Sequence, residues 1–173
     1  MQPVPHADIL TLVYPISSDG QRVLMQYHEH AESHSYQRFN GLESRPRPNE
    51  TLIDACLRML RYNHIGHENL TFKGTVHWSK FHVERPSLYG HLFLAHVPQD
   101  QEDTFHAHNH LGPLKWISIQ ELLRGEWPCW PGDAHIFPLL FDHHHEPFFG
   151  LMGYENGVPH KWSYQRGQLT SSF

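Results

Sequence analysis

The chain has 173 residues, two cysteines and a formal net charge of -5, from thirteen Lys and Arg and eighteen Asp and Glu. The length suits one domain with its own core, two cysteines do not form a disulfide framework, and the scattered basic residues argue against a nucleic-acid polymer as partner. No apolar run is long enough to span a membrane and no signal-peptide pattern begins the chain, so we expect a single cytoplasmic domain over residues 1–173 with no membrane partner.

The first third of the chain predicts a β-hairpin followed by a loop. The apolar, β-rich runs Asp8–Ile16 and Arg22–Tyr27 are joined by a Ser-Ser-Asp-Gly turn, as expected for two antiparallel strands. Residues 28–37 are polar without any period and predict a loop, and residues 38–42 predict the end of a short strand.

A helix should follow this loop. Pro46 and Pro48 exclude a helix immediately after the short strand. Asn49 or Glu50 should then open the helix and Gly66 should end it. Its apolar residues recur at helical spacing on one face, and they are Leu52, Ile53, Cys56, Leu57 and Leu60.

The middle of the chain predicts more strands. Residues 70–78 and 87–97 are apolar and β-rich, and the second run is long enough to lie at the centre of a sheet. Residues 98–112 predict a loop, residues 113–119 a strand and residues 120–124 a short helix.

The last part predicts one more helix and a second hairpin. Asp133 suits the N-cap of a helix over residues 135–141, although Pro138 lies inside it. Residues 148–154 and 161–164 flank Glu-Asn-Gly and predict a hairpin. The elements together predict a mixed central β-sheet flanked by two or three helices, in an α+β or α/β sandwich.

The loop and helix between residues 44 and 66 carry a degenerate motif, SRPRPNETLIDACLRMLRYNHIG. It resembles the Nudix box. That motif has a glycine, five residues later a glutamate, and seven residues after that the run R-E-U-x-E-E-x-G-U, where U is apolar. Aligned without gaps from Ser44 to Gly66, the chain keeps Glu50, Arg58 and Leu60. The three glutamates of the metal-binding helix are replaced by Met59, Tyr62 and Asn63.

Motifs outside the box support this resemblance. The run before the box begins Asn40-Gly41-Leu42, and residues 130–133 read Trp-Pro-Gly-Asp, followed by Phe-Pro-Leu-Leu at residues 137–140. They resemble the branch of the Nudix hydrolases that acts on oxidised purine nucleoside triphosphates such as 8-oxo-dGTP. The resemblance extends from Asp8 to about Tyr164 and implies the Nudix fold, an α/β/α sandwich.

The altered box affects the expected metal chemistry. Carboxylates on one face of a helix suit Mg²⁺, a hard cation that takes oxygen ligands, and in the family the metals polarise a pyrophosphate. Met59, Tyr62 and Asn63 supply a thioether, a phenol and an amide, none of which is negatively charged. We therefore expect impaired or lost hydrolysis, with Mg²⁺ or Mn²⁺ as a cofactor only if hydrolysis is retained. Glu50 and Arg58 are expected to pair and to clamp the loop to the helix.

Three residues outside the helix resemble the base-binding residues of that branch. Asn40 and Asp133 resemble the pair that hydrogen-bonds the edge of an oxidised purine, and Trp130 resembles the ring that stacks on it. The resemblance therefore implies a purine-nucleotide-like pocket. The simpler alternative is that Trp130 is a core aromatic, Asn40 satisfies a turn and Asp133 only caps a helix.

Histidines and arginines are the other candidate ligands. Imidazole suits Zn, Ni, Cu or Fe, and if residues 106–110 formed a strand, three histidines would lie on one face. The three histidine clusters are His106, His108 and His110; His28, Glu29, His30 and His34; and His64 and His67 with Glu68, which lie nearest the altered box positions. A solvated loop is the simpler interpretation of each. Four arginines could hold phosphate, namely Arg38, Arg45, Arg47 and Arg61. For Arg45 and Arg47 the simpler interpretation is an exposed loop face.

Two functions are consistent with these features. The first is a purine-nucleotide-binding module that has lost hydrolysis. The alternative is an active, divergent Nudix pyrophosphohydrolase with metal ligands outside the box, for which the available acids are Glu43, Glu68, Glu102 and Asp103. A third possibility, an interaction domain with a collapsed pocket, requires that Trp130 be buried against core side chains.

Overall fold

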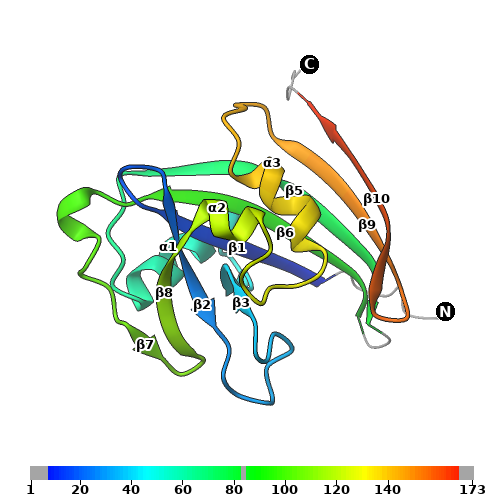
Figure 1. The fold of residues 1–173 in the computed structure, drawn as a ribbon, viewed down its shortest axis with the longest axis horizontal. Coiled ribbons are helices and arrows are strands. Elements are labelled where there is room, and N and C mark those ends of the chain that lie inside the picture. Colours follow the sequence, from blue (N-terminus) through cyan, green and yellow to red (C-terminus); the bar gives the residue numbers. More distant parts are fainter. Residues whose placement is uncertain (1–7, 83–84, 168–173) are drawn as a thin grey trace.

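The computed structural model describes residues 8–82 and 85–167 (Figure 1). None of the helices in this part of the chain is long and apolar enough to cross a bilayer. The elements are β1 Asp8–Ile16, β2 Arg22–Tyr27, β3 Phe39–Asn40, β4 Leu42–Ser44, α1 Leu52–Tyr62, β5 Asn69–His82, β6 Arg85–His96, the 3₁₀ turn η1 Gln99–Gln101, β7 His108–Asn109, β8 Gly112–Ser118, α2 Ile119–Leu123, α3 Asp133–Leu140, β9 Phe148–Glu155 and β10 Val158–Arg166.

The strands form one mixed sheet in the order β10-β9-β5-β6-β1-β2-β8-β7. Strand β1 lies parallel to β6 and β5 lies parallel to β9, whereas the hairpin partners are antiparallel. The predicted hairpins β1–β2 and β9–β10 are both present, and the second turns through Asn156 and Gly157, which both have positive φ. The predicted mixed sheet is therefore confirmed.

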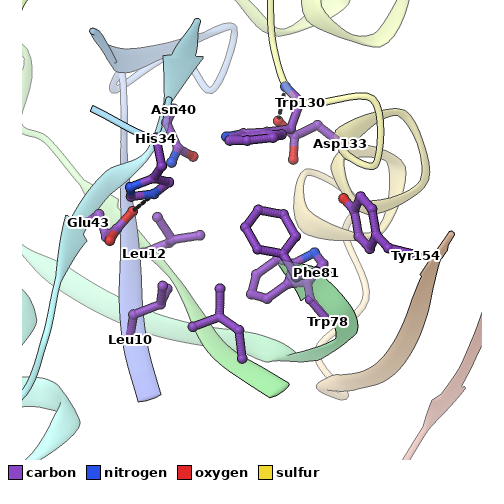
Figure 2. Close-up of a pocket in the computed structure, with 11 residues that line it drawn as sticks. Leu10, Leu12, His34, Asn40, Glu43, Trp78, Phe81, Trp130, Asp133 and Tyr154 are labelled. Atoms are coloured by element: carbon purple, nitrogen blue, oxygen red, sulfur yellow. Dashed lines mark hydrogen bonds and ion pairs between the residues drawn. The ribbon is translucent and has the colours of Figure 1, made fainter. Parts of the chain in front are cut away.

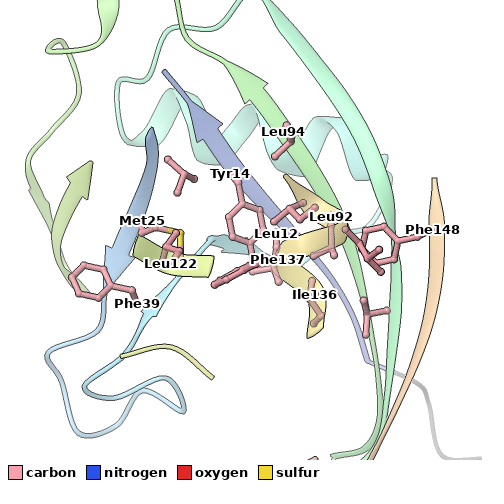
Figure 3. Packing of buried hydrophobic residues seen from close by; sticks show 14 of the residues in the cluster. Leu12, Tyr14, Met25, Phe39, Leu92, Leu94, Leu122, Ile136, Phe137 and Phe148 are labelled. Carbon is pink, nitrogen blue, oxygen red and sulfur yellow. The ribbon is translucent and has the colours of Figure 1, made fainter. Parts of the chain in front are cut away.

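Two apolar cores lie on opposite faces of this sheet, because side chains alternate along a strand. On β1, Tyr14 faces the core that contains Phe137 of α3, whereas its neighbour Val13 faces the core that contains Leu60 of α1. Figure 3 shows the first core, where Leu12, Tyr14 and Leu92 meet the side chains of α3. In Figure 1, α2 and α3 lie in front of the sheet and α1 lies behind it. This is the expected α/β/α sandwich.

The segment β3–β4 fills a split in the sheet. Strands β1 and β2 pair at Ile16 and Val23 and then separate, with β4 paired to β1 and β3 paired to β2. The chain crosses between them at Gly41, where an added Cβ would lie 2.6 Å from the buried ring of Tyr14. The expected strand at residues 38–42 is therefore two short strands, and the split brings the residues on both sides of Gly41 to one edge of the first core.

Helix α1 is shorter than the sequence predicts. Thr51 is its N-cap, and Thr51 and Asp54 form a capping box, so the predicted start at Asn49 or Glu50 is wrong. The helix ends at Tyr62, because His64 takes a positive φ of 55°, and not at Gly66. The predicted apolar face is also partly wrong.

Within α1, the fully buried residues are Ala55, Cys56 and Leu60. Ile53 was expected on the buried face, but 53% of its surface is exposed. The box helix is therefore anchored by its second and third turns.

The later elements follow the prediction with shifted bounds. Strands β5 and β6 are longer than predicted, and the loop at residues 98–112 contains η1 and the short strand β7. Asp133 is the first residue of α3 and Gly132 is its N-cap, so the predicted capping role of Asp133 is wrong. Its carboxylate instead accepts a hydrogen bond from a residue before the helix.

Candidate functional site

A narrow pocket lies beside the split in the sheet, at the edge of the first core (Figure 2). Asn40 and His34 line one side of it, and Trp130, Asp133 and Phe81 line the other. It contains about 420 Å³ of empty space with its open mouth included, of which about 40 Å³ admits the centre of a water molecule. We call this pocket the slot. Its remaining lining residues are Leu10, Leu12, Glu43, Trp78, Leu88 and Tyr154.

The turn before α3 holds two of the pocket residues together. The backbone N–H of Trp130 donates to Oδ2 of Asp133 at 3.0 Å. Asp133 is buried, and this burial raises the pKa of its carboxyl to about 7, although the Trp130 N–H and the charge of Arg38 oppose the shift. Near neutral pH this carboxyl can therefore either donate or accept a hydrogen bond. Its second oxygen, Oδ1, has no hydrogen-bond partner within residues 8–82 and 85–167.

Trp130 is held by a hydrogen bond at its edge and by contacts with a guanidinium and a second ring. Its Nε1–H donates to Oγ of Ser35 at 3.1 Å, and the guanidinium of Arg38 lies 4.4 Å from the ring centroid. Phe81 contacts the ring with a centroid distance of 5.3 Å. Trp130 is half-buried and lies outside both apolar cores of the described residues. This position differs from the core burial that a collapsed pocket requires.

Asn40 presents a free amide to the same pocket. Its Oδ1 accepts the backbone N–H of Gly41 at 2.9 Å, which orients the side chain. The Nδ2 group has no hydrogen-bond partner in the described part of the chain. The pocket therefore combines a free amide donor, a titratable carboxyl and an indole face. Each of the three residues expected in a purine pocket lines this one slot.

A histidine–glutamate pair, which the sequence does not assign to the pocket, lies on its left side in Figure 2. Nε2 of His34 lies 3.1 Å from Oε2 of Glu43. Burial would raise the pKa of Glu43, but the hydrogen bond and charge of His34, together with Arg45 and His28, outweigh it and hold the pKa below its usual value. Glu43 is therefore a carboxylate at neutral pH.

A second, wider cleft begins on the other side of this pair. His34 and Glu43 line both spaces, so the slot and the cleft adjoin. In this cleft about 700 Å³ admits the centre of a water molecule, compared with about 40 Å³ in the slot, and the cleft runs past Ser44, Arg58 and Met59 of the degenerate motif. We call it the histidine cleft, after His28, His30, His34 and His110, which line it. A ligand that fills the slot could extend into this cleft.

Comparison with known proteins identifies the architecture. No protein-family model matches the chain, and no curated protein matches it. Among solved structures, MutT from Bacillus halodurans superposes with a TM-score of 0.72 at 17% identity, over 91% of this chain and 97% of that chain. MutT from Methanosarcina mazei gives a TM-score of 0.60 at 13% identity, over 79% of this chain and 93% of that chain.

A third similar structure is the Nudix domain of Shewanella oneidensis NrtR in complex with ADP ribose. It superposes with a TM-score of 0.59 at 13% identity, over 80% of this chain and 90% of that chain. The chain has the Nudix fold. The fold expected from the degenerate box and the distant motifs is thus confirmed, while similarity at such low identity carries no statement about activity.

In this Nudix fold, the clamp of the box is present. Nε of Arg58 donates to Oε1 of Glu50 at 2.7 Å, and Nη2 donates to Oε2 at 2.9 Å and to the carbonyl of Arg45 at 3.0 Å. The hydrogen bonds from Arg58 and from the backbone of Arg47 lower the pKa of Glu50 to about 2. The loop before α1 is therefore tied to the helix as predicted.

The residues at the three glutamate positions do not fit the family's magnesium cluster. Asn63 is fully buried, donates to the carbonyl of Met59 at 2.9 Å, and accepts from Nδ2 of Asn109 at 2.8 Å. Tyr62 is exposed, and its hydroxyl lies 3.0 Å from Nδ1 of His110. Met59 offers only a thioether to the cleft. Because Mg²⁺ requires hard oxygen ligands, this set lacks the donors that such a cluster needs.

The predicted cluster of His106, His108 and His110 is separated by the fold. His106 stacks on His64 with centroids 3.8 Å apart, His108 contacts Glu29 at 3.0 Å, and His110 contacts Tyr62. Three imidazoles would share one face only if residues 106–110 formed a strand, and β7 contains only residues 108 and 109.

The other candidate metal ligands are also dispersed. Within residues 8–82 and 85–167, no three His, Cys, Asp or Glu side chains lie close enough together to hold a metal ion. His64, His67 and Glu68 therefore do not form a metal site. Of the acids considered as replacement ligands, Glu102 is bound by Ser18 and Arg22. Only Glu43 lines the histidine cleft.

Proposed function

We propose that this Nudix-fold protein binds a purine nucleotide without hydrolysing it. The base occupies the slot, Trp130 stacks on it, and Asn40 and Asp133 hydrogen-bond its edge. The protein then acts as a nucleotide-responsive module and not as a diphosphatase.

The observation that carries this proposal is the set of free groups in the slot. Nδ2 of Asn40 and Oδ1 of Asp133 have no hydrogen-bond partners among the described residues, yet both residues line the same narrow space as Trp130. Nearly buried polar groups are normally paired. A purine edge offers alternating donors and acceptors that complement an amide and a carboxyl.

The state of Asp133 supports a purine over a simple aromatic ring. A carboxyl with a pKa of about 7 can offer both an O–H donor and a carbonyl acceptor. Stacking on an aromatic side chain is worth about 1–3 kcal/mol per base, and does not depend strongly on which base is bound. The edge contacts of Asn40 and Asp133 therefore provide the selectivity, and Trp130 provides affinity.

The chemistry of α1 supports binding without hydrolysis. Asn63 is engaged by Asn109, and neither Met59 nor Tyr62 carries a negative charge at neutral pH. Without a metal to polarise the pyrophosphate and prepare water, the main catalytic contribution of this fold is missing. The complex of the Shewanella oneidensis NrtR Nudix domain with ADP ribose is an example of the same fold with a nucleotide-like ligand.

Two measurements test this proposal together. In the presence of EDTA, a purine nucleotide should raise the thermal unfolding midpoint of the protein, because a ligand that binds only the folded state stabilises it. With Mg²⁺ or Mn²⁺ and no EDTA, 8-oxo-dGTP and GTP should release no phosphate or pyrophosphate. Metal-dependent turnover would support the divergent hydrolase instead, and indifference to every purine nucleotide would rule out the binding module.

A further inference from the structure

One face of the sheet is covered by a helix over only part of its width. Helix α1 lies on this face and contacts chiefly β1 and β4, whereas α2 and α3 lie on the other face. In Figure 1, α1 lies behind the left part of the sheet, and β9 and β10 form its right side. Beside α1, the neighbouring strands β1, β6, β5, β9 and β10 present a surface that we call the open face.

Strand register defines a row of side chains across the open face. In order across the five strands, the row reads Ile9, Tyr89, His77, Leu151 and Ser163. Paired residues point to the same side of a sheet, and side chains alternate along each strand. The whole row therefore lies on the side of the α1 core and opposite the slot.

Large apolar side chains on this face remain exposed. Ile9 is 47% exposed, Phe149 40% and Leu151 37%. The start of α1 borders the face, because Leu52 and Ile9 line one hollow, and the next residue, Ile53, is 53% exposed. Single exposed apolar side chains are common, but a contiguous group of them marks an interaction site.

The polar side chains of the open face pair with one another. Oγ1 of Thr75 lies 2.9 Å from Nδ1 of His91. Nε2 of His77 lies 2.7 Å from Oγ of Ser87. The ring of His77 also stacks on that of Tyr89, with centroids 4.2 Å apart and planes 6° apart. Because these groups already have partners within the chain, another protein can cover them with little loss of hydrogen bonding.

The centre of the open face carries little charge. Burial lowers the pKa of His91, so its imidazole is neutral at neutral pH. The rows on either side of the first contain no Asp or Glu and a single Lys, and they consist of Ser87, Ser79, Gly153 and Lys161, and of Thr11, His91, Thr75, Phe149 and Gln165. The chain as a whole has a net charge of -5, yet two copies can meet here without opposing carboxylates. A charged partner would find no complementary charges.

The arrangement of layers favours a second copy as the partner. Strand β5 is the middle one of the five, so a twofold axis along β5 places β1 of one copy over β10 of the other. An α-helix is about 10 Å in diameter, and packed sheets lie about 10 Å apart. The partner's sheet would therefore lie in the layer that α1 occupies, with its β10 beside Ile53, and the same contact would form twice.

The size of the open face also suits a dimer. Five strands and three rows of side chains span about 500 Å² of flat area. The relief of the side chains and the flank of α1 extend this toward the roughly 800 Å² per partner that a specific interface buries.

We propose that the open face is the interface of a homodimer, in which two copies pack sheet on sheet about a twofold axis along β5. The inference is independent of nucleotide binding, because the slot lies on the opposite face of the sheet, where Leu10 and Leu12 line it. Both slots stay accessible in this dimer.

Sedimentation velocity of the full chain tests the interface. Between about 1 and about 200 µM, the range in which an interface of this size can be weak, a dimer should form. Leu151→Asp should weaken it by about tenfold or more, because it places an unpaired charge at the centre of the interface. Leu123→Asp is the matched control, since Leu123 is also exposed but lies on α2, on the other side of the sheet. If Leu151→Asp fails to fold, Phe149→Asp replaces it.

A monomer at every concentration would overturn the inference. A dimer of equal affinity in the wild type and Leu151→Asp would also overturn it, because the contact would then use another surface.

Chemical cross-linking tests the orientation of the two copies. In the proposed dimer, Ile9 of one copy faces Ser163 of the other, whereas the two Ile9 positions lie on opposite sides of β5, roughly 20 Å apart. A short bismaleimide should therefore link a mixture of Ile9→Cys and Ser163→Cys, and should link neither variant alone nor the wild type with its Cys56 and Cys129. Absence of the mixed product, or equal linkage of Ile9→Cys alone, would contradict the twofold axis along β5.

Discussion

The backbone N–H of Trp130 donates to the carboxylate of Asp133 three residues later, so one turn holds both the ring and the carboxyl of the slot. The carboxyl is buried by this arrangement, and its pKa rises to about 7 as a result. A base-reading carboxyl and a stacking ring are therefore positioned together, and a change at either residue should affect the other.

Asp133→Asn should change the pH dependence of stability. The folded state holds the Asp133 proton up to a pH of about 7, whereas an unfolded Asp loses it near a pH of about 3.9, so the wild type loses stability as the pH rises between these values. Between about pH 4 and about pH 8, the free energy of unfolding of the wild type should fall by roughly 2–4 kcal/mol relative to that of Asp133→Asn. Urea unfolding at several pH values measures it. A difference between the two proteins that does not change with pH would contradict titration of a buried Asp133. Asp100→Asn, at an exposed site, is the control.

Restoring a glutamate at position 63 should destabilise the protein. Asn63 is fully buried and shares hydrogen bonds with Met59 and Asn109. Asn63→Glu buries a charge and removes the Nδ2 donor to the Met59 carbonyl, which should cost roughly 3–5 kcal/mol in the free energy of unfolding. Tyr62→Glu, at the adjacent exposed box position, should change it by no more than about 0.5 kcal/mol. Equal effects in chemical denaturation would show that the amide pair is not structural.

Gly41→Ala should disturb both stability and the slot. The new Cβ would lie 2.6 Å from the Tyr14 ring, which is buried and has no room to move away. Overpacking of this kind costs about 1–3 kcal/mol, and displacement of the β3–β4 crossing should also move Asn40. Gly153→Ala is the matched control, because its Cβ would make only ordinary contacts of 3.6 Å or more. A wild-type unfolding midpoint for Gly41→Ala would contradict this packing.

The Glu50–Arg58 clamp should make the loop before α1 sensitive to acid. The pKa of Glu50 is lowered to about 2 by Arg58, so the stabilisation is complete above the ordinary value of 4.5 and is lost as the pH falls toward 2. Glu50→Gln should remove this acid dependence and speed amide hydrogen exchange at Arg45, Arg47 and Asn49. Glu68→Gln, an exposed glutamate without an ion pair in the described residues, is the control. Unchanged exchange in Glu50→Gln would show that the clamp does not order the loop.

Local patterns were sufficient to predict much of the fold. Both hairpins follow from alternating apolar strands and strong turn residues, and the box helix follows from its apolar spacing. Thr51 and Asp54 form a capping-box pattern in the sequence, which indicates the observed start of the helix better than Asn49 or Glu50 does. The α/β/α layering came from the family resemblance, because periodicity alone does not assign elements to the two faces.

Only those site residues that lie in recognisable motifs are predictable from the sequence. Asn40, Trp130 and Asp133 were predicted from the resemblance, and the fold brings them to one slot. His34 and Phe81 join them through the split between β1 and β2 and through the long β5–β6 hairpin, and no local signal indicates either contact. The burial of His28 Nε2 and Ser44 Oγ without a hydrogen bond among the described residues likewise depends on tertiary packing.

The most direct test of the central claim is a calorimetric titration of 8-oxo-dGTP into the full chain in EDTA. The account predicts binding that Trp130→Ala weakens by about ten- to a hundredfold through loss of stacking, while Tyr164→Ala, an exposed aromatic outside the slot, leaves it unchanged. Binding that is absent in EDTA, or equal in the wild type and Trp130→Ala, would contradict it.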